Sequence, residues 1–156
     1  ISLVHEILSH HDEESIDISA VAKRLMELVI HSLVSKDCAV TYDFDGEPIV
    51  MASDAATSIS LVLNELITNA ILHGFSTRER GHLEVSIHAD GSEGIICVCD
   101  DGIGFSMPLP PSERRHLGLT IVQTLVEKEL QGTIDFQKRM PSGTAVKIAF
   151  PIHKGE

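Results

Sequence analysis

One stretch of the sequence places a carboxylate, an amide and an imidazole where a single helical face would carry all three. Glu65, Asn69 and His73 follow one another at intervals of four residues, so in a helix they stack along one side. Such a stripe is most often a solvated polar face. Here Leu61 and Leu72 border it with apolar side chains, and an apolar border is more typical of the wall of a pocket.

A second stretch, CVCDDGIGF at residues 97–105, sets two adjacent carboxylates after an apolar run. Asp100 and Asp101 are followed by Gly102 and Gly104. Two neighbouring negative charges repel each other, and glycine loses more backbone entropy on ordering than other residues. An Asp-Gly turn is the ordinary explanation, because this dipeptide is common in turns. Alone, the stretch predicts a turn, and only other motifs beside it would indicate a site.

The elements that must position these residues alternate between helices and strands. Helical periodicity predicts four helices, at residues 1–11, 18–29, 54–73 and 117–130. Alternating or continuous apolar runs predict six strands, at residues 38–44, 48–51, 83–89, 95–99, 134–136 and 146–150. The order predicts an α/β two-layer sandwich, with a mixed, mostly antiparallel sheet covered on one face by helices.

The ends of several elements also have sequence signals. Asp17 and the pair Ser53-Asp54 are predicted to cap the second and third helices. Gly74 is predicted to end the third helix, and Asp45-Gly46 to form a turn between the first two strands. Prolines in the segment 105–116 predict irregular structure there.

Composition restricts the partners. The chain has 156 residues, which suits one domain with a core, and its formal net charge is −11. This charge argues against a nucleic-acid groove, which needs clustered Lys and Arg. A phosphate-bearing ligand would therefore need a cation or backbone N–H groups to offset the protein's negative field.

Local metal-binding patterns are incomplete. HEILS at residues 5–9 lacks the second histidine of a zinc-protease helix, and DFDG at 43–46 lacks the later acidic ligands of a calcium loop.

The three cysteines, Cys38, Cys97 and Cys99, form no Cys-x-x-Cys pair. Because no apolar run approaches the roughly 20 residues of a membrane span, we expect a reduced, cytoplasmic domain.

Together, the two stretches resemble motifs of the ATP-binding catalytic domain of sensor histidine kinases, in the gyrase, heat-shock chaperone, histidine kinase and MutL superfamily. Four motifs carry the resemblance: the N box NELITNAILHG at 64–74, the first glycine box Asp-x-Gly-x-Gly at 100–104, the second glycine box and its helix HLGLTIVQTLVEKELQGTI at 116–134, and the closing strand GTAVKIAFP at 143–151. The set covers nearly the whole chain and implies a Bergerat-type ATP-binding fold.

The resemblance implies a site for ATP and Mg²⁺. Asp100 would accept a hydrogen bond from the exocyclic amine of adenine, and Gly102 and Gly104 would let the backbone approach the ring. Asn69 would ligate Mg²⁺ through its amide oxygen, and Glu65 would act through a metal-bound water near the γ-phosphate. The other implied nucleotide-binding residues are His73, Gly118, Leu119 and Thr144. Asp101, Arg114 and Arg115 have an ordinary alternative as solvated turn or loop residues.

The resemblance also implies a function and an architecture. The chain would donate the γ-phosphoryl group of ATP to a histidine on an adjacent dimerisation domain, in a homodimer that signals to a response regulator. Residues 1–15 would be the end of the dimerisation helix and a linker, and residues 16–156 the catalytic domain. ISLVHEIL and the lone His-Leu-Gly-Leu resemble the branch with a His-His-Arg-type acceptor motif, whose regulators are often RNA-binding antiterminators.

Two alternative functions stay open. One is an ATPase or an anti-sigma-factor serine kinase with the same fold, and the expected helix at residues 1–11 favours the histidine kinase over it. The other is a non-catalytic nucleotide sensor. Leu72 keeps this second alternative open, because the family commonly has a lysine before His73.

Overall fold

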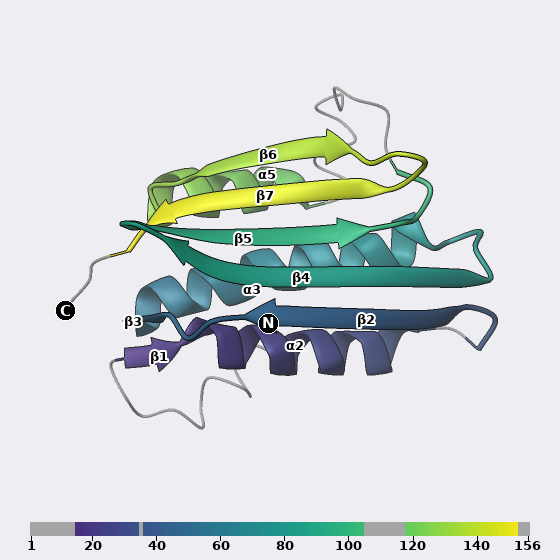
Figure 1. Ribbon diagram of the computed structural model, residues 1–156, viewed down its shortest axis with the longest axis horizontal. Helices are drawn as coiled ribbons and strands as arrows, with labels where there is room; N and C mark the ends of the chain where they lie inside the picture. Colours follow the sequence, from purple (N-terminus) through teal and green to yellow (C-terminus); the bar gives the residue numbers. More distant parts are fainter. Residues whose placement is uncertain (1–14, 35, 105–117, 153–156) are drawn as a thin grey trace.

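A five-stranded sheet forms one layer of the computed structural model, which describes residues 15–34, 36–104 and 118–152 (Figure 1). In spatial order the strands are β2 (Ala39–Gly46), β4 (Arg80–Asp90), β5 (Glu93–Asp100), β7 (Thr144–Pro151) and β6 (Thr133–Lys138). β2 and β4 are parallel, and the other neighbouring strands are antiparallel. The predicted mixed, mostly antiparallel sheet is therefore confirmed.

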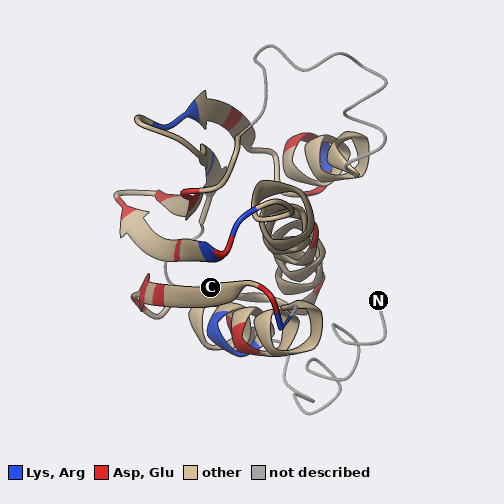
Figure 2. Cartoon of the chain, turned by 90° about the vertical axis from the view of Figure 1, so that its right-hand side faces the viewer, with Lys and Arg blue, Asp and Glu red and all other residues tan. Residues whose placement is uncertain are grey.

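The helices form the second layer, on one face of the sheet (Figure 1, Figure 2). They are α2 (Ile18–Leu33), α3 (Ser53–Asn69) with its π-helical continuation η1 (Ala70–Gly74), and α5 (Leu119–Thr124) with its π-helical continuation η2 (Leu125–Glu129). Alternate strand residues turn toward these helices and are buried, namely Leu83, Val85, Ile87, Ile96, Val98, Val146, Ile148 and Phe150. The opposite face, called the outer face below, carries the polar alternate residues of β2 and β4.

The long helical segment α3–η1 lies at the centre of the core. Its buried apolar stripe consists of Ile59, Val62, Leu63, Leu66 and Ile67, at the spacing of a helix that packs through one broad face. By length and composition alone, the 22 residues of Ser53–Gly74 could cross a membrane, but most of this segment's apolar window is buried inside the protein. Burial of this kind is what a core helix requires, and it fixes the polar side of α3 relative to the sheet.

The capping prediction is confirmed for α2 and wrong for α3. The Asp17 carboxylate accepts a hydrogen bond from the Ser19 N–H at 3.0 Å, at the start of α2. At α3 the N-cap position is Ala52, which gives no side-chain hydrogen bond. The reason is that Ala52 still pairs with Ser15 in a strand ladder, so the chain enters the helix directly from a strand.

The turn predicted at Asp45-Gly46 is also wrong. β2 continues through Gly46, which is opposite Ile87 in the parallel ladder with β4. The next residue, Glu47, extends this pairing by donating its N–H to the Ile87 carbonyl at 2.9 Å. The following strand, β3 (Val50–Ala52), belongs to a separate two-stranded sheet with β1 (Ser15–Asp17).

Candidate functional site

Asp100 is the last residue of β5, and its carboxylate is buried with 7% of the residue exposed. The Gly102 N–H donates to Asp100 Oδ1 at 2.9 Å. Thr144 lies opposite Asp100 at the start of β7. Its side-chain oxygen, Thr144 Oγ1, is buried and has no hydrogen-bond partner among the residues that the structure describes. A buried hydroxyl without a partner beside a buried carboxylate is an arrangement that a polar ligand or water would complete.

The glycines after Asp100 allow close contact between backbones. A Cβ built at Gly102 would lie 2.3 Å from the carbonyl oxygen of Gly74, and the Ile103 N–H donates to that same oxygen at 2.8 Å. A Cβ built at Gly104, where φ is +75°, would lie 3.1 Å from the Gly143 carbonyl oxygen. We expected these glycines to admit an adenine ring. In the structure, the close approach that Gly102 permits is to the end of η1.

The helical stripe is arranged partly as predicted. Asn69 is the last residue of α3 and is buried, and Glu65, one turn earlier, is half-buried. His73 is half-buried within η1, where the wider π-helical turn departs from the four-residue spacing. Gly74 ends this segment as predicted, and a Cβ built there would lie 3.2 Å from Asp100 Oδ1. The end of the helix therefore lies against the Asp100 carboxylate.

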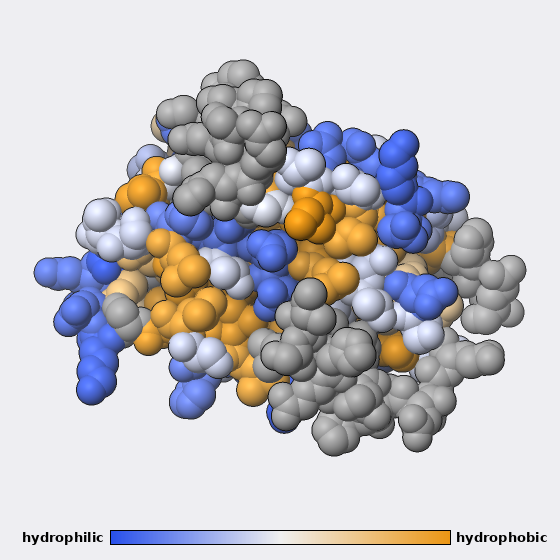
Figure 3. Space-filling model, turned by 180° about the vertical axis from the view of Figure 1, so that it is seen from behind, coloured by the Kyte–Doolittle hydropathy of each residue, from blue (hydrophilic) through white to orange (hydrophobic). Residues whose placement is uncertain are grey.

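Leu61 and Leu72, which we expected to border the stripe, have different surroundings in the structure. Leu61 packs against the core. Leu72 is 47% exposed and lines a different hollow of about 230 Å³ beside Leu33 and Phe75, which neither the stripe nor Asp100 lines. Apolar side chains reach the surface on this helix-covered side (Figure 3). Leu72, where the sequence departs from the family pattern, therefore contributes to this hollow.

The start of α5 lies beside Glu65. Gly118 has φ +72° at the N-cap position of α5, and a Cβ built there would lie 2.5 Å from Glu65 Oε2. The positive φ favours glycine at this position, and the short distance shows how closely the Glu65 carboxylate approaches the start of α5. Leu119 is 3% exposed and belongs to the core, so any contact of this residue with a ligand would come from its backbone.

Two residues that were not predicted as site residues stabilise the turn after β5. Asp101 is a structural turn residue, because its Oδ1 accepts the His82 N–H at 2.8 Å. Arg78 was missed by the sequence analysis. Its guanidinium donates to the Gly102 carbonyl and to Ser142 Oγ, each at 3.2 Å. No motif marks Arg78, because its partners are far away in the sequence. Arg114 and Arg115 lie outside the described residues.

Burial raises the pKa of the Asp100 carboxyl above its ordinary value, although backbone N–H groups of Gly102 and Thr144 oppose the shift. The native carboxyl therefore keeps its proton to a higher pH than the unfolded one. Its contribution to the free energy of unfolding is full below the unfolded pKa and is lost as the pH rises through the native pKa.

As the pH rises through this window, we therefore expect the wild type to lose stability relative to Asp100→Asn. Denaturant unfolding of both chains at a series of pH values measures the difference, with Asp101→Asn at the exposed neighbour as the matched control. A difference that is constant or moves the opposite way would show that the folded protein does not disfavour the ionised Asp100.

The site thus combines a buried carboxylate at the end of β5 with the end of the helical segment that carries Asn69 and Glu65. Residues 54–154 match the family described as histidine kinase-, DNA gyrase B-, and HSP90-like ATPase. The chain therefore belongs to this family. The resemblance inferred from the four motifs is confirmed at this level.

Curated relatives and solved structures agree with this assignment. The chain is 31% identical over 153 residues to the sensor histidine kinase PdtaS of Mycolicibacterium smegmatis, covering 97% of this chain and 30% of that protein. It is 31% identical over 104 residues to the anti-sigma F factor of Priestia megaterium, covering 55% of this chain and 70% of that protein. The chain thus spans about a third of the length of the PdtaS relative.

The fold matches the histidine kinase domain of the blue-light activated histidine kinase EL346 from Erythrobacter litoralis. The TM-score is 0.80 at 23% sequence identity, covering 96% of this chain and 70% of that chain. The catalytic domain of the histidine kinase ThkA has a TM-score of 0.67 at 21% identity, covering 88% of this chain and 94% of that chain. These likenesses confirm the predicted α/β sandwich.

Proposed function

We propose that this chain binds Mg-ATP and presents the γ-phosphoryl group to a histidine of a dimerisation domain, as the catalytic part of a sensor histidine kinase. The observation that carries the proposal is the buried Asp100 carboxylate opposite the Thr144 hydroxyl, which has no partner among the described residues. The similarity to PdtaS along 97% of this chain supports a histidine kinase. The proposal places the full-length protein in a homodimer with a response regulator partner, and its catalytic domain in the cytoplasm.

The described residues fit adenine at one end of the site. The Gly102 N–H donates to Asp100 Oδ1, and the Thr144 N–H also interacts with the carboxylate. Because an ionised carboxylate has about four acceptor sites, it can also accept from the exocyclic amine of the base. A charged acceptor makes such a bond shorter and stronger than a neutral one. The Thr144 hydroxyl can both donate and accept, so it satisfies either a ring nitrogen or a bridging water. Burial at both residues excludes bulk water from the recognition contacts.

The residues also fit a magnesium ion at the other end. Asn69 and Glu65 offer amide and carboxylate oxygens, which are hard ligands of the kind Mg²⁺ prefers. Bound there, the ion would neutralise charge on the phosphates, in a protein whose formal net charge is −11. The Glu65 carboxylate beside Gly118 would orient a water or the incoming imidazole. The chain's own contribution to transfer is thus positioning and electrostatic complementarity.

Phosphoryl transfer with this chain alone is expected to fail, although ATP binds. A nucleophile must come within about 3–3.5 Å of the phosphorus in line with the leaving oxygen, and the acceptor we propose belongs to the dimerisation domain. Incubation of the chain with labelled ATP, with and without the histidine-bearing domain, tests this. The label should appear on a histidine only when that domain is present. Label on His5, which lies outside the described residues, would overturn the proposed division at residues 15 and 16.

A serine kinase is the second candidate, favoured by the match that covers 70% of the Priestia megaterium anti-sigma F factor. Acid stability separates the two functions, since phosphoserine survives acid and phosphohistidine does not. Label on the partner that resists acid would support the serine kinase. Binding of ATP without transfer to either acceptor would support the nucleotide sensor.

A further inference from the structure

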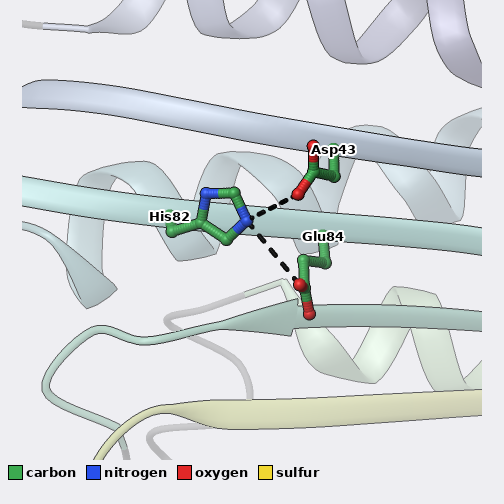
Figure 4. Close-up of side chains that lie close together, drawn as sticks. All are labelled: Asp43, His82 and Glu84. Atoms are coloured by element: carbon green, nitrogen blue, oxygen red, sulfur yellow. Dashed lines mark hydrogen bonds and ion pairs between the residues drawn. The ribbon is translucent and has the colours of Figure 1, made fainter.

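Three side chains that can bind a metal ion meet on the outer face of the sheet, across the parallel pair β2 and β4 (Figure 4). Asp43 comes from β2, the edge strand of the described sheet. His82 and Glu84 lie two residues apart on β4, so both point to the same face. Asp43 is opposite Glu84 in the ladder. This cluster is on the opposite side of the sheet from α3, the helix that carries Glu65 and Asn69.

The spacing of the ligand atoms suits a small four-coordinate ion. His82 Nε2 lies 3.1 Å from Asp43 Oδ2 and 3.6 Å from Glu84 Oε1, and the three ligand atoms lie within 4.8 Å of one another. Bond lengths of about 2.0–2.2 Å to nitrogen and oxygen in a tetrahedral zinc site place neighbouring ligands roughly 3.3–3.6 Å apart. The cluster therefore needs adjustments of only a few tenths of an ångström at the two measured edges.

His82 and Glu84 each have a second polar atom that contacts another group. Thr41 Oγ1 lies 2.7 Å from His82 Nδ1. When the threonine oxygen accepts the Nδ1 proton, the lone pair of the neutral imidazole is on Nε2, the atom that faces the carboxylates. The Arg139 guanidinium lies 3.8 Å from Glu84 Oε2, on the oxygen that does not face His82. Both contacts leave the ligand atoms directed at one another.

We propose that Asp43, His82 and Glu84 form a site for a divalent ion of the zinc class, with water completing the coordination. A ring nitrogen and two carboxylates are a ligand set that zinc accepts, whereas magnesium and calcium prefer oxygen alone. A divalent ion would place two positive charges between the two carboxylates, whereas protonation of His82 would place only one there. Bound there, the ion ties the edge strand β2 to the interior of the sheet.

A second pair on the same strands supplies a matched control. His88 Nε2 lies 3.4 Å from Asp45 Oδ2, again between β4 and β2. No third ligand joins this pair among the described residues. His88→Ala and Asp45→Asn therefore make the same chemical changes as His82→Ala and Asp43→Asn without removing a ligand from the proposed site. Asp43 and Asp45 are both strongly exposed, so the asparagine variants should fold.

Calorimetric titration of the nucleotide-free chain with ZnCl₂ in phosphate-free buffer tests the proposal. His82→Ala should lower the zinc affinity by more than about 100-fold, beyond the roughly 10- to 100-fold loss typical when a ligand's outer hydrogen-bond partner is removed. Thr41→Val removes such a partner and should lower the affinity by about tenfold. Asp43→Asn should weaken binding, and Asp45→Asn and His88→Ala should leave it unchanged.

Cysteine binding is the main competing explanation for a zinc signal. Cys97 and Cys99 are half-buried on the outer face, and Cys99 is opposite Glu84. The Cys97→Ser, Cys99→Ser double variant should keep the His82-dependent binding. Loss of zinc binding in this variant, equal affinities in the wild type and His82→Ala chains, or an equal loss in His82→Ala and His88→Ala would each overturn the proposal. Thermal unfolding without zinc shows whether each variant folds.

Discussion

ATP affinity is expected to fall by about 1.5–3 kcal/mol, or roughly 10- to 150-fold, when Asp100 is replaced by asparagine. The Gly102 N–H already donates to Oδ1. In the variant, the amide oxygen would keep that hydrogen bond, and the amide nitrogen would take the place of Oδ2. Two donors, the amide and the exocyclic amine of adenine, would then face each other. The loss should be visible by calorimetry with ATP.

The same contact predicts selectivity for the base. Guanine would present its carbonyl oxygen to the Asp100 carboxylate, so GTP should bind more weakly than ATP by a similar factor. Asp101→Asn is the matched control, because the neighbouring carboxylate bonds to the His82 backbone and its amide oxygen can keep that bond. Equal affinities for ATP and GTP, or equal losses in the two asparagine variants, would remove Asp100 from the proposed base site.

Asn69→Ala should abolish the part of ATP affinity that depends on Mg²⁺ and leave the metal-free affinity unchanged. The amide oxygen is the proposed ligand, and Asn69 is placed at the end of α3 in a buried position. Thermal unfolding with ATP, in magnesium or in chelator, measures both quantities. For the wild type, a ligand at about 100 times its dissociation constant should stabilise the fold by about 2.7 kcal/mol.

The metal-free measurement shows whether the Asn69→Ala chain still forms the base site. Asn64→Ala supplies a matched control, because Asn64 is an asparagine of the same helix outside the stripe of Glu65 and Asn69. The control should keep the full magnesium increment. If Asn69→Ala also keeps it, the ion is held by other residues, and the proposed role of Asn69 is wrong.

Much of the fold could be predicted from local patterns. The cap at Asp17, the alternation in β4 and the end of the helical segment at Gly74 each depend on a few neighbouring residues. Features that depend on distant partners could not be predicted in this way. β1 has three residues, and its partner β3 begins more than thirty residues later. Gly46 remains in a strand because β4 pairs with it.

The same distinction applies to the candidate site: its motif residues could be predicted from the sequence, and contacts between distant segments could not. Motif order identified Asp100, Asn69 and Thr144 as candidates, because each lies in one of the four motifs that carry the resemblance. The pattern carried no information on what each side chain touches. The hydrogen bonds from Arg78 to the turn and the separate hollow beside Leu72 arise from packing across segments. The cluster of Asp43 and His82 depends on strand pairing for the same reason.

The contact of Gly102 with Gly74 has a consequence for the thermodynamics of binding. The turn after Asp100 is ordered by two hydrogen bonds, from the Gly102 N–H to the Asp100 side chain and from the Ile103 N–H to the Gly74 carbonyl. Both bonds are made within the chain itself. A base that binds at Asp100 therefore meets a preorganised acceptor, and the loss of conformational entropy in this turn falls on folding rather than on association.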